Sequence, residues 1–159
     1  MVACYMNVHL KAPINTPFVP EDFFSGTLGA SGMFIDRFGA VQKRFSADVK
    51  CTSLDNGFVL DEHFTFDDGT RESRIWQITQ QSPNRYLGLT DDVKGKAIGT
   101  LTDIGLMWRY DFYLSMFGKR VLVNFNDKMI MQSPNVVLNH AIITKFGLKL
   151  GELFISFYK

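Results

Sequence analysis

The sequence predicts an all-β fold, a closed or nearly closed antiparallel barrel of about ten strands, from three observations. Its 159 residues include fifteen phenylalanines and thirteen glycines, and strand surfaces favour aromatic side chains while their turns favour glycine. After residue 22, turn signals recur about every 10–14 residues, as in an all-β domain. No interval between turns has room for a crossover helix, so sequential antiparallel pairing is the simplest topology.

Length and charge restrict the classes of protein that the chain can belong to. One domain of ordinary size fits 159 residues, and 46% hydrophobic residues are enough for a core. The formal net charge of +1 excludes the strongly basic surface with which nucleic-acid binders neutralise phosphates. No apolar run reaches the roughly 18 residues of a membrane-spanning helix. We therefore expect neither a nucleic-acid partner nor a transmembrane helix.

Residues 1–22 are expected to form an extended arm or tether ahead of a barrel domain at 23–159. Residues 5–22 contain three prolines and no clean period, which is typical of extended chain. The first residues, Met1-Val2-Ala3-Cys4, resemble the end of a bacterial lipoprotein cleavage site. The basic and apolar regions of a signal peptide are absent, so Cys4 is a lipidation candidate on a short match alone.

Ten strands are expected in the barrel domain, with turn residues between them. Because ten meandering strands leave costly open edges unless the sheet closes, an up-and-down barrel is favoured over a sandwich. The expected strands are 24–36, 41–52, 58–66, 71–80, 85–90, 94–102, 106–116, 121–132, 136–145 and 148–158.

The first two strands have distinct features. Three glycines in strand 24–36 are expected to let it bend at a corner of the barrel, namely Gly26, Gly29 and Gly32. Strand 41–52 alternates apolar residues on one face and ends with Cys51, which we expect to be a small buried hydrophobe.

The third and fourth strands predict a polar pair inside the barrel. In 58–66 the even positions are apolar except for Glu62, and strand 71–80 carries Arg74, Trp76 and Ile78 on one face. A three-residue turn, Asp67-Asp68-Gly69, with Gly69 left-handed, lets both apolar faces point inward. This register places Glu62 opposite Arg74 as an inward ion pair beside aromatic residues.

The seventh and eighth strands predict a second polar pair. A two-residue turn at Gly118-Lys119 sets Tyr110 opposite Asp127 and Trp108 opposite Met129. In the last hairpin the inward face is ambiguous. It is either the face with Leu153, Ile155 and Phe157 or the face with Leu150, Glu152 and Phe154.

Charged and polar groups inside a barrel are costly unless they are paired, and three explanations stay open. The two pairs can fix strand register and serve structure alone. Alternatively, Arg74 and Tyr110 can hold a carboxylate or phosphate head while Phe, Trp and Met side chains contact an acyl chain. A third interpretation takes Glu62 and Asp127 as the two carboxyl groups of a glycoside hydrolase.

Other catalytic or metal-binding patterns are weak. His9, His63 and His140 are widely separated, and His63 falls on the expected outer face, so packed or exposed histidines are favoured over a metal site. Neither cysteine has a neighbouring histidine, and no G-x-S-x-G element occurs. The sequence therefore predicts no enzyme activity, no cofactor and no metal.

Several motifs together resemble an uncharacterised family of bacterial proteins described as lipoproteins. They cover about residues 23–158. The motifs are Phe23-Phe24-Ser25-Gly26, Gly32-Met33-Phe34-Ile35-Asp36-Arg37-Phe38-Gly39, Arg44-Phe45, Leu60-Asp61-Glu62-His63-Phe64, Asp67-Asp68-Gly69, Arg74-Ile75-Trp76, Asp91-Asp92-Val93, Gly95, Ala97, Gly99, Trp108-Arg109-Tyr110, Leu138-Asn139, Lys145-Phe146-Gly147 and Gly151-Glu152.

The resemblance implies a lipocalin-like, or calycin-like, barrel and a lipoprotein signal peptide, and it implies no activity. It also strengthens Cys4 as a lipidation site. Two departures weaken the transfer of any site near the eighth and ninth strands. The family usually shows Asp-Asp-Trp-Met-Tyr where this chain has Asn126-Asp127-Lys128-Met129-Ile130, and it often shows Asn-Arg where this chain has Asn139-His140.

The resulting hypothesis is a non-catalytic, envelope-associated, lipocalin-like protein that binds a lipid or another hydrophobic small molecule. The alternative is a structural or assembly subunit of an envelope complex with a filled barrel. We expect a periplasmic protein, anchored to the outer membrane if Cys4 is lipidated, and a cytoplasmic one if the chain starts at Met1. The residues expected to line the interior are Glu62, Arg74, Trp76, Trp108, Tyr110 and Asp127.

Overall fold

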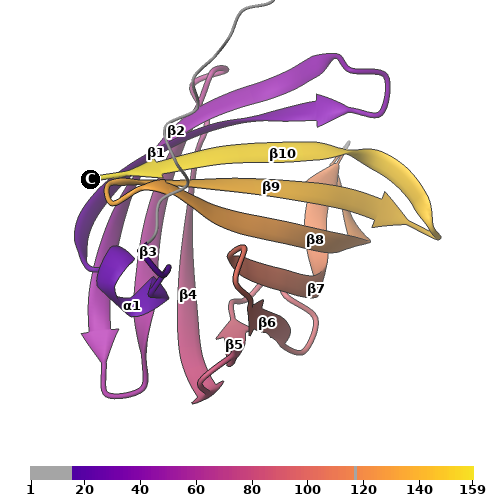
Figure 1. The fold of residues 1–159 in the computed structure, drawn as a ribbon. Helices are drawn as coiled ribbons and strands as arrows, with labels where there is room; N and C mark the ends of the chain where they lie inside the picture. Colours follow the sequence, from indigo (N-terminus) through magenta and orange to yellow (C-terminus); the bar gives the residue numbers. More distant parts are fainter. Residues whose placement is uncertain (1–15, 117) are drawn as a thin grey trace, which may run out of the picture.

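The computed structural model describes residues 16–116 and 118–159, which form a closed barrel of ten antiparallel strands (Figure 1). Each strand pairs with its neighbours in sequence, and β1 pairs with β10 to close the barrel. The predicted all-β, up-and-down barrel is confirmed. The strands are β1 (Gly26–Asp36), β2 (Val41–Leu54), β3 (Gly57–Phe66), β4 (Arg71–Ser82), β5 (Arg85–Leu89), β6 (Ala97–Leu101), β7 (Leu106–Met116), β8 (Lys119–Ser133), β9 (Val136–Lys145) and β10 (Leu148–Tyr158).

The β3–β4 hairpin has the predicted register. Glu62 pairs with Arg74 and Leu60 pairs with Trp76. The Phe66 amide donates a hydrogen bond to the Thr70 carbonyl oxygen at 2.9 Å, and Gly69 has a φ of +82°. The three-residue turn therefore holds the even residues of both strands on the inner face, as the alternation predicted.

The β7–β8 hairpin differs from the predicted register by two residues. Met116 pairs with Lys119, so residues 117 and 118 separate the strands, and Tyr110 faces Phe125 rather than Asp127. Trp108 faces Asp127. Moving the turn back by one residue moves every partner by two, and this keeps each side chain on its own face. The inward set is therefore correct although the individual pairs are not.

Residues Pro20–Phe23 form a short helix, α1, and not the extended arm expected up to residue 22. Pro20 lies in the first turn, where its missing N–H costs no hydrogen bond. The adjoining Phe24 stacks on Phe58 at 5.3 Å between ring centroids and lies edge-on to Phe157 at 5.6 Å. These contacts tie the helix to the barrel.

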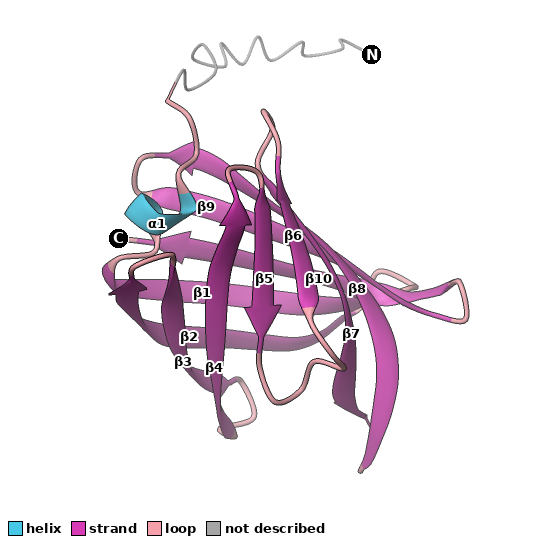
Figure 2. Ribbon diagram, turned by 90° about the horizontal axis from the view of Figure 1, so that it is seen from below, coloured by secondary structure: helices cyan, strands magenta, loops and turns pink. Residues whose placement is uncertain are grey.

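The helix closes one end of the barrel, beside the C-terminus (Figure 2). The Lys159 ammonium donates to the Asp22 carbonyl oxygen at 3.0 Å, and the Tyr86 hydroxyl donates to Glu21 Oε2 at 3.2 Å. Burial and, to a smaller extent, the neighbouring Glu21 raise the pKa of Tyr86. The opposite end, where β1 turns into β2 and β3 into β4, is called here the open end.

The core has two parts. One surrounds Phe24 and Phe58 beside α1, and the other surrounds Phe112 and Phe125 towards the open end. In β10, Phe157 and Ile155 pack into the first part, whereas Phe154 is exposed. The inward face of the last hairpin is therefore the one with Leu153, Ile155 and Phe157. Among the described residues no helix has the length and apolar character needed to cross a bilayer.

Candidate functional site

The six residues predicted to line the interior all face inward. Glu62, Trp108 and Asp127 are buried, while Arg74, Trp76 and Tyr110 keep partial exposure. They come from β3, β4, β7 and β8 and meet where the two parts of the core join. We call Glu62, Arg74, Tyr110, Asp127 and the additional residue Asn139 the interior polar cluster.

Arg74 does not form the predicted ion pair with Glu62. Its Nε lies 3.5 Å from Asp92 Oδ2 in the β5–β6 connection, and its guanidinium lies over the rings of Phe64 and Phe112, at 5.5 and 4.9 Å from their centroids. An arginine is long enough to reach past its strand partner to a better hydrated carboxylate and to stack on aromatic faces.

The Arg74 guanidinium keeps unused hydrogen-bonding capacity. Although Nε is close enough to Asp92 for attraction between charges, the geometry forms no hydrogen bond, and this buried nitrogen has no other protein partner among the described residues. Asp92 is also shared with Arg120, whose Nη2 lies 3.5 Å from Oδ1. Arg74 is therefore a cation whose neutralisation is incomplete.

Glu62 is a buried carboxyl group directly across from Arg74. Burial raises its pKa to about 7, and the positive charge of Arg74 only partly offsets this. Within residues 16–116 and 118–159, no side chain donates a hydrogen bond to it. Near neutral pH this carboxyl group is therefore partly protonated.

Tyr110 and Asp127 form the second predicted contact despite the shifted register. The Tyr110 hydroxyl donates to Asp127 Oδ2 at 3.0 Å, because a tyrosine can span the diagonal to a residue two positions from its direct partner. The Tyr110 ring stacks on Phe125 at 5.2 Å and meets Trp76 edge-on at 5.6 Å. Aromatic packing therefore holds the hydroxyl in place.

Asn139 completes the cluster and was not among the predicted residues. Its Nδ2 donates to Asp127 Oδ2 at 3.4 Å, while Asp127 Oδ1 and Asn139 Oδ1 are buried without a partner in the part of the chain that the structure describes. Burial raises the pKa of Asp127 to about 7, against the lowering effect of its two hydrogen bonds. The inward alternation of Val137, Asn139 and Ala141 could have identified this asparagine.

Other predicted groups lie outside the cluster. Cys51 is buried, and burial raises the pKa of its thiol to about 11, so it is the inert hydrophobe expected. His63 is exposed, with Nε2 3.0 Å from Asp61 Oδ1. In the described part of the chain no group of three His, Cys, Asp or Glu residues could hold a metal ion. Cys4 and His9 lie outside the described residues.

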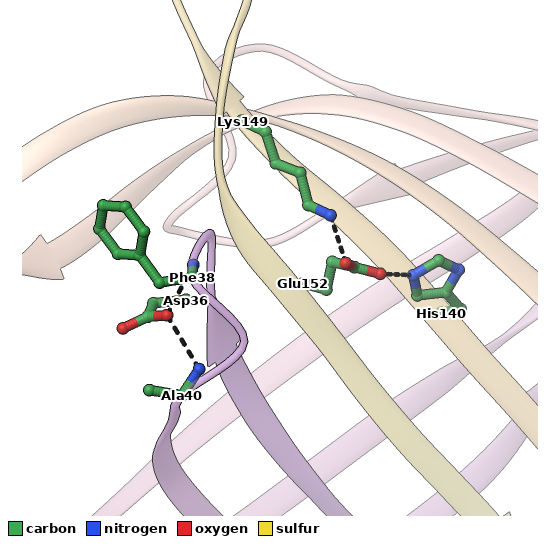
Figure 3. A network of polar contacts seen from close by, with 6 residues as sticks. All are labelled: Asp36, Phe38, Ala40, His140, Lys149 and Glu152. Atoms are coloured by element: carbon green, nitrogen blue, oxygen red, sulfur yellow. Dashed lines mark hydrogen bonds and ion pairs between the residues drawn. The ribbon is translucent and has the colours of Figure 1, made fainter.

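A second polar network lies on the outer surface of β9 and β10 (Figure 3). Glu152 contacts the Lys149 ammonium, and its Oε2 lies 2.6 Å from His140 Nε2. These partners hold the pKa of Glu152 below its usual value. In the β1–β2 turn, the amides of Phe38 and Ala40 donate to Asp36 Oδ1 at 2.9 and 3.0 Å.

Two hollows open on the outside of the barrel. One has a volume of about 660 Å³ and crosses β2, β1, β10, β9 and β8. The other has a volume of about 380 Å³ and lies over β7 and β8 beside Lys94 and Lys96. Both are lined mainly by side chains that point away from the barrel interior.

Comparisons with known proteins identify a family and a shared fold. The model of the family described as "Protein of unknown function (DUF3833)" matches residues 1–159. No curated protein matches the sequence. The solved structure of the S-type phycobiliprotein lyase CPES from Guillardia theta is similar over 87% of this chain and 89% of that chain, with a TM-score of 0.64 and 8% identity.

A redesigned β-barrel, mFAP1 bound to DFHBI, overlaps 87% of this chain and 97% of its own, with a TM-score of 0.48 and 8% identity. At 8% identity the lyase shows a common barrel fold, and this agrees with the predicted lipocalin-like class. Because a protein named as a lyase has this fold, the fold by itself does not exclude catalysis.

Proposed function

We propose that this chain, which belongs to the DUF3833 family of unknown function, binds a hydrophobic small molecule with an anionic head at the open end of its barrel, without catalysis. The observation that carries the proposal is Arg74. Its guanidinium is partly exposed, stacked between aromatic rings and incompletely neutralised. Such a cation is suited to hold a carboxylate or phosphate.

The surroundings of Arg74 provide an apolar contact surface for the rest of such a ligand. Several inward residues towards the open end are only partly buried, and they pack against the buried second part of the core. Ligand sites of this kind combine an apolar lining with a few polar groups that orient the molecule. The partly buried inward residues are Phe34, Leu114, Val121 and Leu153.

Replacing Arg74 with methionine is expected to weaken binding of dansyl-undecanoic acid by roughly tenfold or more, since a charge-assisted hydrogen bond contributes about 1.5–3 kcal/mol. Energy transfer from the two tryptophans to the dansyl group measures the affinity. Arg71→Met, an exposed arginine on the same strand, is the matched control and should bind normally. Unchanged affinity in Arg74→Met, with only its stability altered, would show that the arginine is purely structural.

The alternative, an assembly subunit with a filled barrel, is favoured by one separate observation. The half of the interior beside α1 is packed with buried side chains, among them Phe23, Phe24, Phe58 and Phe157. Native mass spectrometry of protein purified from its own host separates the two functions. A lipid-sized adduct supports ligand binding, whereas a stoichiometric protein partner supports assembly.

We further propose that the protein is envelope-associated and that Cys4 is its lipidation site, on the strength of the Val2-Ala3-Cys4 match alone. Mass analysis of the mature protein from its host is expected to show a chain that begins at a diacylated Cys4. A mature chain that retains an unmodified Met1 would contradict this proposal and leave the ligand hypothesis untouched.

A further inference from the structure

The larger outer hollow, called here the outer groove, is built by two rows of side chains that run across the strands. The first row follows the strand pairing directly. Arg44 pairs with Met33, Met33 with Phe154, Phe154 with His140, and His140 with Lys128. Cross-strand partners project from the same face of a sheet. One cation therefore stands at each end of a row whose middle is Met33, Phe154 and the His140 ring.

The second row explains why this surface is hollow. Ile130 pairs with Leu138, Leu138 with Ser156, and Ser156 with Ser31. Two small serines thus lie beside Phe154 and Met33 of the first row, and the difference in height leaves a depression with apolar walls. All of these residues line the groove of about 660 Å³.

The apolar part of the groove is exposed to solvent. Leu138 keeps 44% and Phe154 36% of their surface accessible, and the Phe154 ring lies flat against the His140 ring at 4.6 Å. Adjacent large apolar side chains on a surface indicate an interaction site, whereas isolated ones do not. The contact with His140 holds the Phe154 ring in a fixed orientation.

The charges around the groove select the kind of occupant. Arg44 and Lys128 line it and no carboxylate does, although Arg44 Nε donates to Asp67 Oδ2 of the β3–β4 turn at 3.4 Å. Glu152, the acid nearest in sequence to the lining residues of β10, is already engaged by Lys149 and His140. The two cations lie four strand spacings apart, about 19 Å at the usual strand spacing of roughly 4.8 Å. The groove is therefore an elongated, largely apolar channel with a cation at each end, of which Lys128 is the one not paired with Asp67.

We propose that the outer groove binds one molecule of a long-chain amphiphile with an anionic headgroup, distinct from the ligand of the open end. The acyl chain lies across Phe154, Leu138 and Ile130, and the headgroup contacts Lys128. A volume of about 660 Å³ is within the usual range of small-molecule sites, and a concave channel fits a single chain better than the surface of a bilayer. A second copy of the protein would bring the same cations to the contact, where they would repel.

Methyl-labelled protein mixed with doxyl-stearate, below the concentration at which the fatty acid forms micelles, tests this site directly. The nitroxide broadens the NMR signals of methyl groups close to it. We expect broadening at Met33, Ile130 and Leu138, which point outward. Broadening confined to the inward Leu114 and Val121 would overturn the groove site while supporting the site at the open end.

Leu138→Glu places a carboxylate in the groove at an exposed position, so it should fold normally, and at least ten times more doxyl-stearate should be needed to broaden the Met33 and Ile130 signals. Ile75→Glu, at a still more exposed position on β4, is the matched control and should leave this broadening unchanged. The same broadening of Met33 and Ile130 in Leu138→Glu and in the parent protein overturns the proposal. So does binding to phosphatidylglycerol vesicles without binding to the monomeric fatty acid, because the surface would then recognise a membrane.

Discussion

The free energy of unfolding is expected to fall by several kcal/mol as the pH rises from about 5 to about 8.5. The cause is the pair of buried carboxyl groups, Glu62 and Asp127, whose pKa values rise to about 7 in the folded protein. An unfolded chain would release these protons near pH 4, so between pH 4 and 7 the folded state binds more protons and stability decreases with pH. Each raised pKa corresponds to a loss on the order of 3 kcal/mol.

The isosteric double variant Glu62→Gln/Asp127→Asn isolates this effect. It should be nearly as stable at pH 8.5 as at pH 5.5, and at pH 8.5 it should be more stable than the parent protein. The new amide of residue 127 can also donate towards Asn139 Oδ1, which has no partner in the parent structure. Urea unfolding at the two pH values measures the change.

Glu72→Gln, at an exposed position of β4, is the control and should retain the pH dependence of the parent. Asp36 and Glu152 do not obscure the result. Their pKa values are lowered in the folded protein, so the stability that they contribute is lost only below about pH 4. A parent protein whose stability is constant or rises between pH 5.5 and 8.5 would contradict the prediction.

The hairpins show which features of the fold can be read from the sequence. In β3–β4 the turn Asp67-Asp68-Gly69 has one register that places both apolar faces inward, so the pairing of Glu62 with Arg74 was predicted correctly. In β7–β8 two registers place the same faces inward. Only the position of Gly118 within the turn distinguishes them, and a glycine with positive φ fits either turn position.

The site was predicted less completely than the fold because its contacts depend on closure of the barrel. Alternation placed Arg74 and Asp127 inside, but it could not show that Arg74 reaches Asp92 in a connection from another part of the chain. Helix α1 was missed because four residues are too few for a helical period. The outer groove crosses five strands, and no local sequence pattern specifies how these strands are aligned with one another.

Replacing Phe24 with alanine is expected to cost about 3–5 kcal/mol of unfolding free energy, the usual range for a buried phenylalanine. Phe24 has 1% of its surface accessible, and its ring joins α1 to Phe58 of β3 and Phe157 of β10. Removing the ring leaves a cavity at the closed end and releases the helix from both strands. A midpoint of thermal unfolding lower by roughly 10 °C is the corresponding shift.

Phe146→Ala is the matched control, since Phe146 is 89% exposed at the β9–β10 turn, and its unfolding free energy should change by less than about 0.5 kcal/mol. A loss below about 1 kcal/mol in Phe24→Ala would mean that α1 is only loosely attached to the barrel. The expected loss of stability would show that the filled end beside α1 supports the barrel. If the folded variant also binds dansyl-undecanoic acid with the parent affinity, the ligand site lies at the open end. Reduced affinity in the folded variant would instead place the ligand beside α1, against the role proposed for Arg74.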